Sequence, residues 1–119
     1  MDVPLAAQIA EEYNAAYDDA PSVGINQGYT VGQAWGAVLE EACDSGDMTR
    51  AGVLAAKEKV TGLDTEGLTG ALNFSVPGAP SSREAYILDV DADAPGGLVI
   101  AQDLFESDVA KDYKAPHQK

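Results

Sequence analysis

The apolar side chains between residues 31 and 42 follow the spacing of a long amphipathic helix. Intervals of three and one place them all on one face, with Glu40 and Glu41 outside it. The pattern predicts a helix over residues 29–44, and Gly46 is suited to end it. The members of this stripe are Val31, Ala34, Trp35, Val38, Leu39 and Ala42.

Two shorter segments also have helical spacing. Residues 4–18 carry a large apolar side chain at every fourth position, Leu5, Ile9, Tyr13 and Tyr17, which lie on one face of a helix. Residues 50–61 form the third predicted helix. Both segments have suitable terminal residues, because Asp, Thr and Pro favour helix starts and proline also ends a helix. These residues are Asp2, Pro4 and Pro21 for the first helix and Asp47 or Thr49 for the third.

Four segments are predicted to be extended. Residues 22–28 read as a buried strand or a loop that leads into the long helix, and Leu72–Phe74 as a short strand. Residues 84–90 form a better strand, and residues 97–102 its antiparallel hairpin partner. Helices followed by antiparallel strands predict an α/β fold, with α+β as the open alternative.

The length of 119 residues is enough for one domain and too little for two. We place a single α/β domain at residues 1–106. Residues 107–119 are charged and aperiodic, so we expect them to form a flexible tail.

The charge balance is strongly acidic. Twenty Asp and Glu residues outnumber seven Lys and Arg residues, which gives a net charge of −13. Nine acidic residues precede the first basic one, Arg50. Nucleic-acid binding needs clustered cations and is therefore excluded, and anionic membrane surfaces would repel the chain. We interpret the acidity as favouring solubility rather than as an acidic docking face.

Neither a signal peptide nor a membrane-inserted segment is predicted. Residues 1–5 lack the basic and apolar regions of a signal peptide. The longest uncharged stretch, residues 20–39, contains amide side chains and several glycines, which do not suit a membrane span.

No catalytic residues, no metal site and no cofactor are predicted. Cys43 is the single cysteine and has acidic neighbours, which do not favour a thiolate nucleophile. His117, the single histidine, lies in the predicted tail. Residues 89–93 resemble the start of a calcium loop, but Ala94 and Ile100 stand where that loop needs Gly and Glu. The sequence therefore predicts that the chain is not an enzyme.

A polar and aromatic cluster precedes the long predicted helix, at Gly24-Ile25-Asn26-Gln27-Gly28-Tyr29. Ligands of open α/β sheets bind where strands end and helices begin, so this cluster is the candidate ligand contact. The alternative is structural: Tyr29 packs at the helix start and Asn26 satisfies backbone groups.

The order of several short motifs resembles a known family. Paired tyrosines at 13 and 17 are followed by Gly28-Tyr29-Thr30 before Trp35, and then by Met48-Thr49-Arg50. Gly67-Leu68-Thr69-Gly70 leads to Asn73-Phe74, and the strand Tyr86–Val90 completes the series. Over residues 5–102 the chain resembles the C-terminal third of the type I solute-binding proteins of ABC transporters, in the leucine/isoleucine/valine-binding branch.

The resemblance implies a partial periplasmic-binding-protein-like lobe, with about three helices and three to four short strands. It implies two α/β lobes that close on a ligand, an amino-acid-like or similar small polar molecule, and a partner ABC permease. It also implies an extracytoplasmic location. The segment before the Gly-Tyr helix edges the cleft in this family, which points to Gly24, Asn26 and Tyr29 as ligand contacts. If the family's aromatic contact falls at Gly24, this chain lacks that side chain.

The resemblance covers only part of this two-lobed fold, so we expect that one copy does not form a complete cleft. We expect the apolar stripes of the first two helices and the strand edges to be exposed, and the chain to form a homodimer or a domain-swapped assembly. The alternative function is an acidic, self-associating structural or interaction domain without a small ligand.

Overall fold

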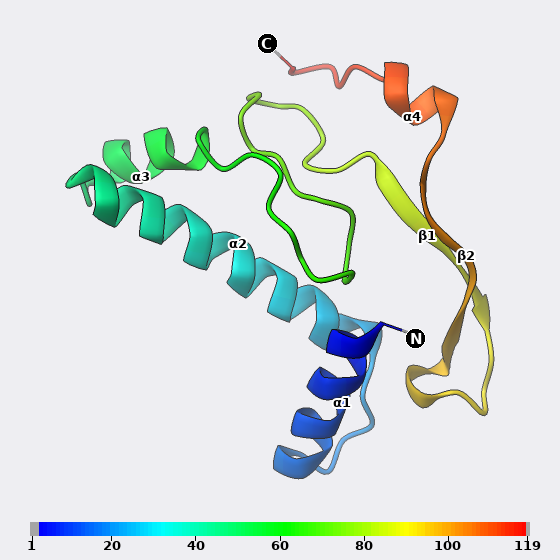
Figure 1. Ribbon diagram of the computed structural model, residues 1–119. Helices are drawn as coiled ribbons and strands as arrows, with labels where there is room; N and C mark the ends of the chain where they lie inside the picture. The colour runs from blue at the N-terminus through cyan, green and yellow to red at the C-terminus, as the bar shows by residue number, and fades with distance from the viewer. Residues whose placement is uncertain (1–2, 119) are drawn as a thin grey trace.

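The computed structural model describes residues 3–118 and contains four α-helices and one two-stranded sheet. Figure 1 shows α2 running across the molecule, α3 beside one end of it and the β1–β2 hairpin on the other side. The elements are α1 (Pro4–Ala16), α2 (Val23–Ser45), α3 (Arg50–Lys57), β1 (Glu84–Val90), β2 (Leu98–Glu106) and α4 (Asp108–Asp112), with a 3-10 turn, η1, at Pro95–Gly97. The predicted α/β class is confirmed.

Helix α1 begins at Pro4, as predicted, because a proline in the first turn has no amide hydrogen to leave unpaired. The predicted cap, Asp2, lies outside the described residues. The helix ends at Ala16, two residues earlier than predicted, and Tyr17 caps it in an extended conformation. The rings of Tyr13 and Tyr17 nevertheless contact each other, with centroids 4.8 Å apart and planes tilted by 35°.

Helix α2 starts six residues earlier than predicted. Residues 22–28 are neither strand nor loop, because Ser22 caps a helix that begins at Val23 and its Oγ accepts a hydrogen bond from Gly24 N at 3.3 Å. The glycines at 24 and 28 do not interrupt this helix. Gly46 ends it with φ of 76°, as predicted, since glycine adopts left-handed angles without strain.

Helix α3 has a network of hydrogen bonds at its start. Thr49 Oγ1 accepts a hydrogen bond from Gly52 N at 3.2 Å, and Asp47 Oδ1 accepts from Thr49 N at 3.0 Å. The Thr49 hydroxyl also donates to Asp47 Oδ1 at 2.6 Å. This bond, and secondarily the one from Thr49 N, lowers the pKa of the Asp47 carboxyl, because both stabilise its charged form. The helix ends at Lys57 and not at residue 61, and Val60 O instead accepts from Phe74 N.

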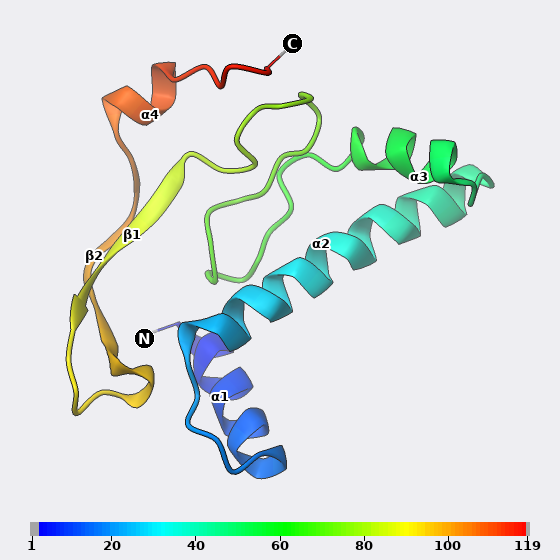
Figure 2. The same cartoon turned by 180° about the vertical axis from the view of Figure 1, so that it is seen from behind.

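The chain between α3 and β1 lies between α2 and the hairpin, as the view from behind also shows (Figure 2). The strand predicted at Leu72–Phe74 is reduced to a single bridge between Leu63 and Leu72, so the described residues contain fewer strands than expected. Thr65 is buried and holds this loop together. Its Oγ1 accepts from Thr69 N at 3.0 Å and donates to Thr69 O at 2.9 Å.

Strands β1 and β2 form the predicted antiparallel hairpin, with Leu88 opposite Ile100 and an irregular register between Ala85 and Leu88. Helix α4 follows within the predicted tail. Ser107 caps it, and the Arg83 guanidinium donates a hydrogen bond to the Ala110 carbonyl, so the start of this segment is ordered. The domain boundary after residue 106 stays a prediction.

Two small apolar clusters replace a single large core. The first joins α1 to the loop and the hairpin, and Tyr86 supports it by donating a hydrogen bond to Gly67 O at 2.7 Å. Burial, and secondarily the negative charge of Asp103, raises the pKa of Tyr86. The second cluster joins α2 to α3. The buried members are Val3, Leu5, Ala6, Ile9 and Leu68 in the first, and Val38, Ala42 and Ala56 in the second.

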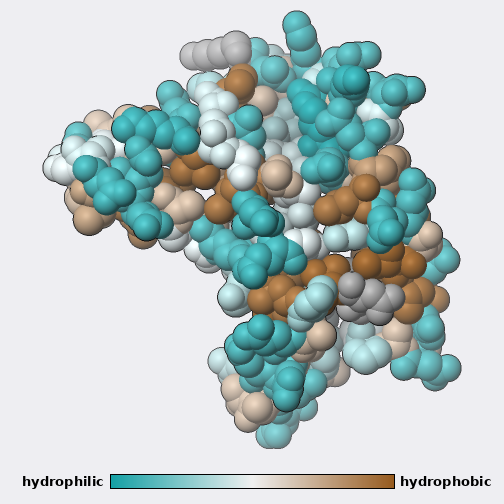
Figure 3. Space-filling view, viewed as in Figure 1, coloured by the Kyte–Doolittle hydropathy of each residue, from teal (hydrophilic) through white to brown (hydrophobic). Residues whose placement is uncertain are grey.

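The chain is more open than a compact domain of its size. Its radius of gyration is 16.5 Å, whereas about 13.5 Å is typical for this length. Its accessible surface is 7971 Å², against about 6,100 Å² for a compact monomer of this mass. Figure 3 shows hydrophobic side chains at the surface between the start of α2 and the hairpin.

The predicted exposure of the helix stripes is partly confirmed. On α2, Val31, Trp35 and Leu39 are between 42% and 55% exposed. On α1 the prediction is wrong for Leu5 and Ile9, which the loop and the hairpin bury. Within the described residues no helix combines the length and the apolar character that a membrane span requires.

Candidate functional site

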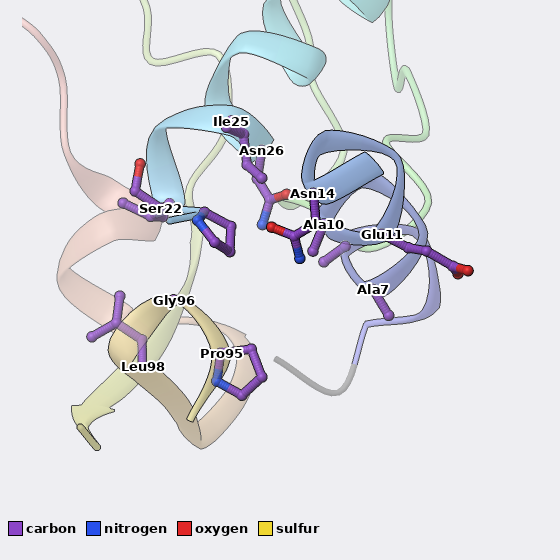
Figure 4. A pocket seen from close by; sticks show the side chains of 13 residues that line it. Ala7, Ala10, Glu11, Asn14, Ser22, Ile25, Asn26, Pro95, Gly96 and Leu98 are labelled. Carbon is purple, nitrogen blue, oxygen red and sulfur yellow. The ribbon is translucent and has the colours of Figure 1, made fainter. Parts of the chain in front are cut away.

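A cavity of about 440 Å³ lies where α1, the start of α2 and the η1 turn approach one another. Figure 4 shows its lining, with the amide side chains of Asn14 and Asn26 turned toward each other and Pro95 on the opposite wall. The volume falls in the usual range for small-molecule sites. The lining residues are Ala6, Ala7, Ala10, Glu11, Asn14, Pro21, Ser22, Val23, Ile25, Asn26, Pro95, Gly96 and Leu98.

Of the three predicted contact residues, Asn26 lines this cavity. Gly24 and Tyr29 lie in the same first turns of α2 but are exposed and outside the lining. The cluster was predicted at a junction between strand and helix. The early start of α2 instead places all three residues on one helix, pointing in different directions around its axis.

The Oδ1 atom of Asn26 is buried without a hydrogen-bond partner among the described residues, as is Oε1 of Gln33, which lies outside the cavity lining. The backbone oxygen of Asn26 does have one, since Thr30 Oγ1 donates to it at 3.0 Å. The Asn26 Oδ1 atom therefore does not satisfy backbone groups, as the structural alternative required. A buried acceptor without a donor costs free energy that a ligand donor can recover.

Sequence reasoning missed the contribution of α1 to this cavity. Ala7, Ala10, Glu11 and Asn14 recur at intervals of three, one and three along the helix, so they share one face next to the apolar stripe. That spacing is visible in the sequence. It did not indicate a cavity wall, because small and polar residues on one face of a helix usually face solvent. Glu11 is the single ionisable side chain of the lining, but its carboxylate points away from the two asparagine amides (Figure 4), so the cavity offers polar amide groups and no charge.

No protein-family model and no curated protein sequence matches the chain. Among solved structures, it is similar to a fatty acid ABC transporter substrate-binding protein from Thermomonospora curvata, with 35% sequence identity and a TM-score of 0.86. The fold is that of a partial periplasmic-binding-protein-like lobe. The match covers 98% of this chain and 30% of the solved protein. The comparison does not single out the leucine/isoleucine/valine-binding branch.

The name of this neighbour describes a substrate-binding component of a transporter, and the non-catalytic role of the present chain stays a prediction. Both side chains considered for catalysis, Cys43 and His117, are exposed in the lobe. Within residues 3–118, no group of three His, Cys, Asp or Glu side chains is placed to hold a metal ion.

Proposed function

We propose that the chain is part of the solute-binding component of an ABC-type uptake system, with no catalytic step of its own. The likeness to the substrate-binding protein supports this proposal, and the unpartnered Oδ1 of Asn26 in a cavity of ligand size is the observation that carries it. The whole protein would act outside the cytoplasm and deliver its solute to an ABC permease. The comparison does not favour the alternative, an acidic domain without a ligand.

We propose an amino acid or a similar small polar molecule as the solute. An ammonium group would donate charge-assisted hydrogen bonds to Asn26 Oδ1. The name of the solved neighbour specifies a fatty acid, which shares the carboxylate of an amino acid but lacks its amino group. The amino group therefore distinguishes the two ligand classes.

The experiment compares leucine with 4-methylpentanoate, which has the same carbon skeleton and carboxylate but no amino group. We expect leucine to perturb the NMR signals of the cavity residues with an affinity near 1 mM, or about −4 kcal/mol, because one lobe encloses the ligand incompletely. Replacing Asn26 with alanine (Asn26→Ala) should abolish this perturbation. Gln27→Ala, which removes an exposed amide from the same helix, should leave it unchanged.

Equal binding of 4-methylpentanoate would exclude the amino-acid class while leaving the cavity as a site. Absence of any perturbation at the cavity by either solute would contradict the site itself. For Gly24 and Tyr29, a role at the cleft edge stays a prediction, because neither lines this cavity.

We also propose that the chain self-associates through the hairpin. Ile87 and Val90 are 46% and 87% exposed, and a two-stranded sheet leaves both strand edges unpaired. Light scattering coupled to size exclusion should give the mass of a dimer, and Val90→Lys should shift it toward the monomer. A monomer at all accessible concentrations would contradict self-association.

A further inference from the structure

Asn14 and Asn26 carry the two amide side chains of the cavity at the start of α2, one on each of the two helices. Figure 4 shows these amides turned toward each other within the lining. Apolar packing of the same helices fixes their positions, because Ile9 of α1 is buried in the first cluster and Ile25 of α2 packs against that cluster. The fold therefore holds the two amides opposite each other.

The two amides differ in burial, and therefore in what each can do for a ligand. The Oδ1 atom of Asn26 is buried without a partner, so it requires a hydrogen-bond donor. Asn14 is exposed, so solvent reaches its amide and a ligand can replace that solvent. An amide holds a carbonyl oxygen and an NH2 group in one plane, and its rotation presents either group. Asn14 can thus donate a hydrogen bond beside the atom that donates to Asn26.

The other polar side chains of the lining leave this pair as the polar contact for a ligand. The Glu11 carboxylate points away from both amides (Figure 4), and Ser22 Oγ accepts a hydrogen bond from Gly24 N at 3.3 Å. Alanine, proline, glycine and aliphatic side chains form the remaining walls. A polar ligand group that enters between α1 and α2 therefore meets Asn14 and Asn26 together.

We propose that Asn14 recognises the carboxylate of the solute while Asn26 recognises its ammonium group. This inference rests on the amino-acid-like solute proposed above and adds a specificity-determining residue on α1. In an α-amino acid both charged groups are bonded to one carbon atom, so two side chains that face each other can contact them at once. The Nδ2 group of Asn14 donates a charge-assisted hydrogen bond to the carboxylate, and Asn26 Oδ1 accepts one from the ammonium.

Three probes with the same branched alkyl chain separate the two contacts. Leucine has both charged groups, 3-methylbutylamine lacks the carboxylate, and 4-methylpentanoate lacks the amino group. NMR titration of the full 119-residue chain gives the dissociation constant of each probe from the signals of the cavity residues. We expect leucine to bind more tightly than either of the probes with one charged group.

Asn14→Ala should weaken leucine binding by about tenfold or more, which is the usual effect of losing a hydrogen bond to a charged group. The same variant should leave the binding of 3-methylbutylamine unchanged, because this probe has no carboxylate. Gln8→Ala is the matched control, since Gln8 is an exposed amide on α1 outside the lining and bonds to Glu12 instead. It should leave the affinity for leucine unchanged.

Asn14→Asp tests the assignment by charge, because aspartate has nearly the same shape as asparagine. It should weaken the binding of leucine and 4-methylpentanoate by repelling their carboxylates. It should strengthen the binding of 3-methylbutylamine by attracting its ammonium group. A residue that only supports the cavity wall would not change the affinities of these probes in opposite directions.

Two results would overturn the inference and leave the proposed function intact. The first is leucine binding that Asn14→Ala leaves unchanged. The second is an equal loss of leucine and 3-methylbutylamine binding in Asn14→Ala, which would show that Asn14 only supports the cavity. Absence of leucine binding to the parent chain is a different outcome, because it would contradict the proposed function and the carboxylate contact together.

Discussion

Replacing Ile9 with alanine should cost about 2–5 kcal/mol of the free energy of unfolding, because it empties the centre of the first apolar cluster. Ile9 is 7% exposed on α1 and packs in the cluster that joins this helix to the loop and the hairpin. Small domains have a total stability of only about 5–15 kcal/mol, so the loss is a large fraction of it. Urea unfolding followed by far-ultraviolet circular dichroism measures the change.

The matched control for Ile9→Ala is Val109→Ala. Val109 is also an aliphatic residue on a helix, but it is 80% exposed on α4. Its replacement should change the stability by less than about 0.5 kcal/mol. If Ile9→Ala were as mild as this control, α1 would not be anchored by the cluster, and the cavity between α1 and α2 would lose its fixed wall.

Gly52→Ala should destabilise the chain by about 1–3 kcal/mol, although alanine is normally the better helix former. An added Cβ at Gly52 would overlap the carbonyl oxygen and the side chain of Asp47. To relieve this overlap, the loop must move and break the bonds from Thr49 N to Asp47 Oδ1 and from Gly52 N to Thr49 Oγ1. Thermal unfolding should therefore occur at a lower temperature than in the parent chain.

Gly36→Ala is the control for the same substitution in an open site. No atom lies within 4 Å of a Cβ added at Gly36, in the middle of α2. Here the usual preference of helices for alanine applies, and the chain should gain about 0.5–1 kcal/mol. Two Gly→Ala changes with opposite sign would confirm the packing at the start of α3. A gain in both variants would show that Asp47 moves aside freely.

Helix termini show how far local sequence reasoning reaches. Asp47 or Thr49 was predicted to cap α3, and Gly46 was predicted to end α2. Thr49 and Gly46 do so, because capping depends on a few neighbouring backbone groups. The start of α2 was predicted wrongly, since Gly24 and Gly28 suggested a break. Ser22 provides a cap upstream of both glycines, and the helix extends through them.

The candidate site was predicted less completely than the helices. Asn26 was selected from the sequence and does line the cavity, but its partners on α1 and in the η1 turn are far away along the chain. Asn14 was not selected at all. Its amide faces Asn26 only where the fold brings α1 beside the start of α2.

By itself the sequence determined the three longest helices, the late hairpin, the acidic charge and the likeness to a solute-binding lobe, because periodicity and turn residues act over short distances. Only the tertiary structure decided which residues of the apolar faces of α1 and α2 are buried. Leu5 and Ile9 are covered by the loop and the hairpin, whereas Trp35 stays exposed because α3 ends too early to reach it. Burial depends on which distant segments meet, and that information is not contained in the period of any one helix.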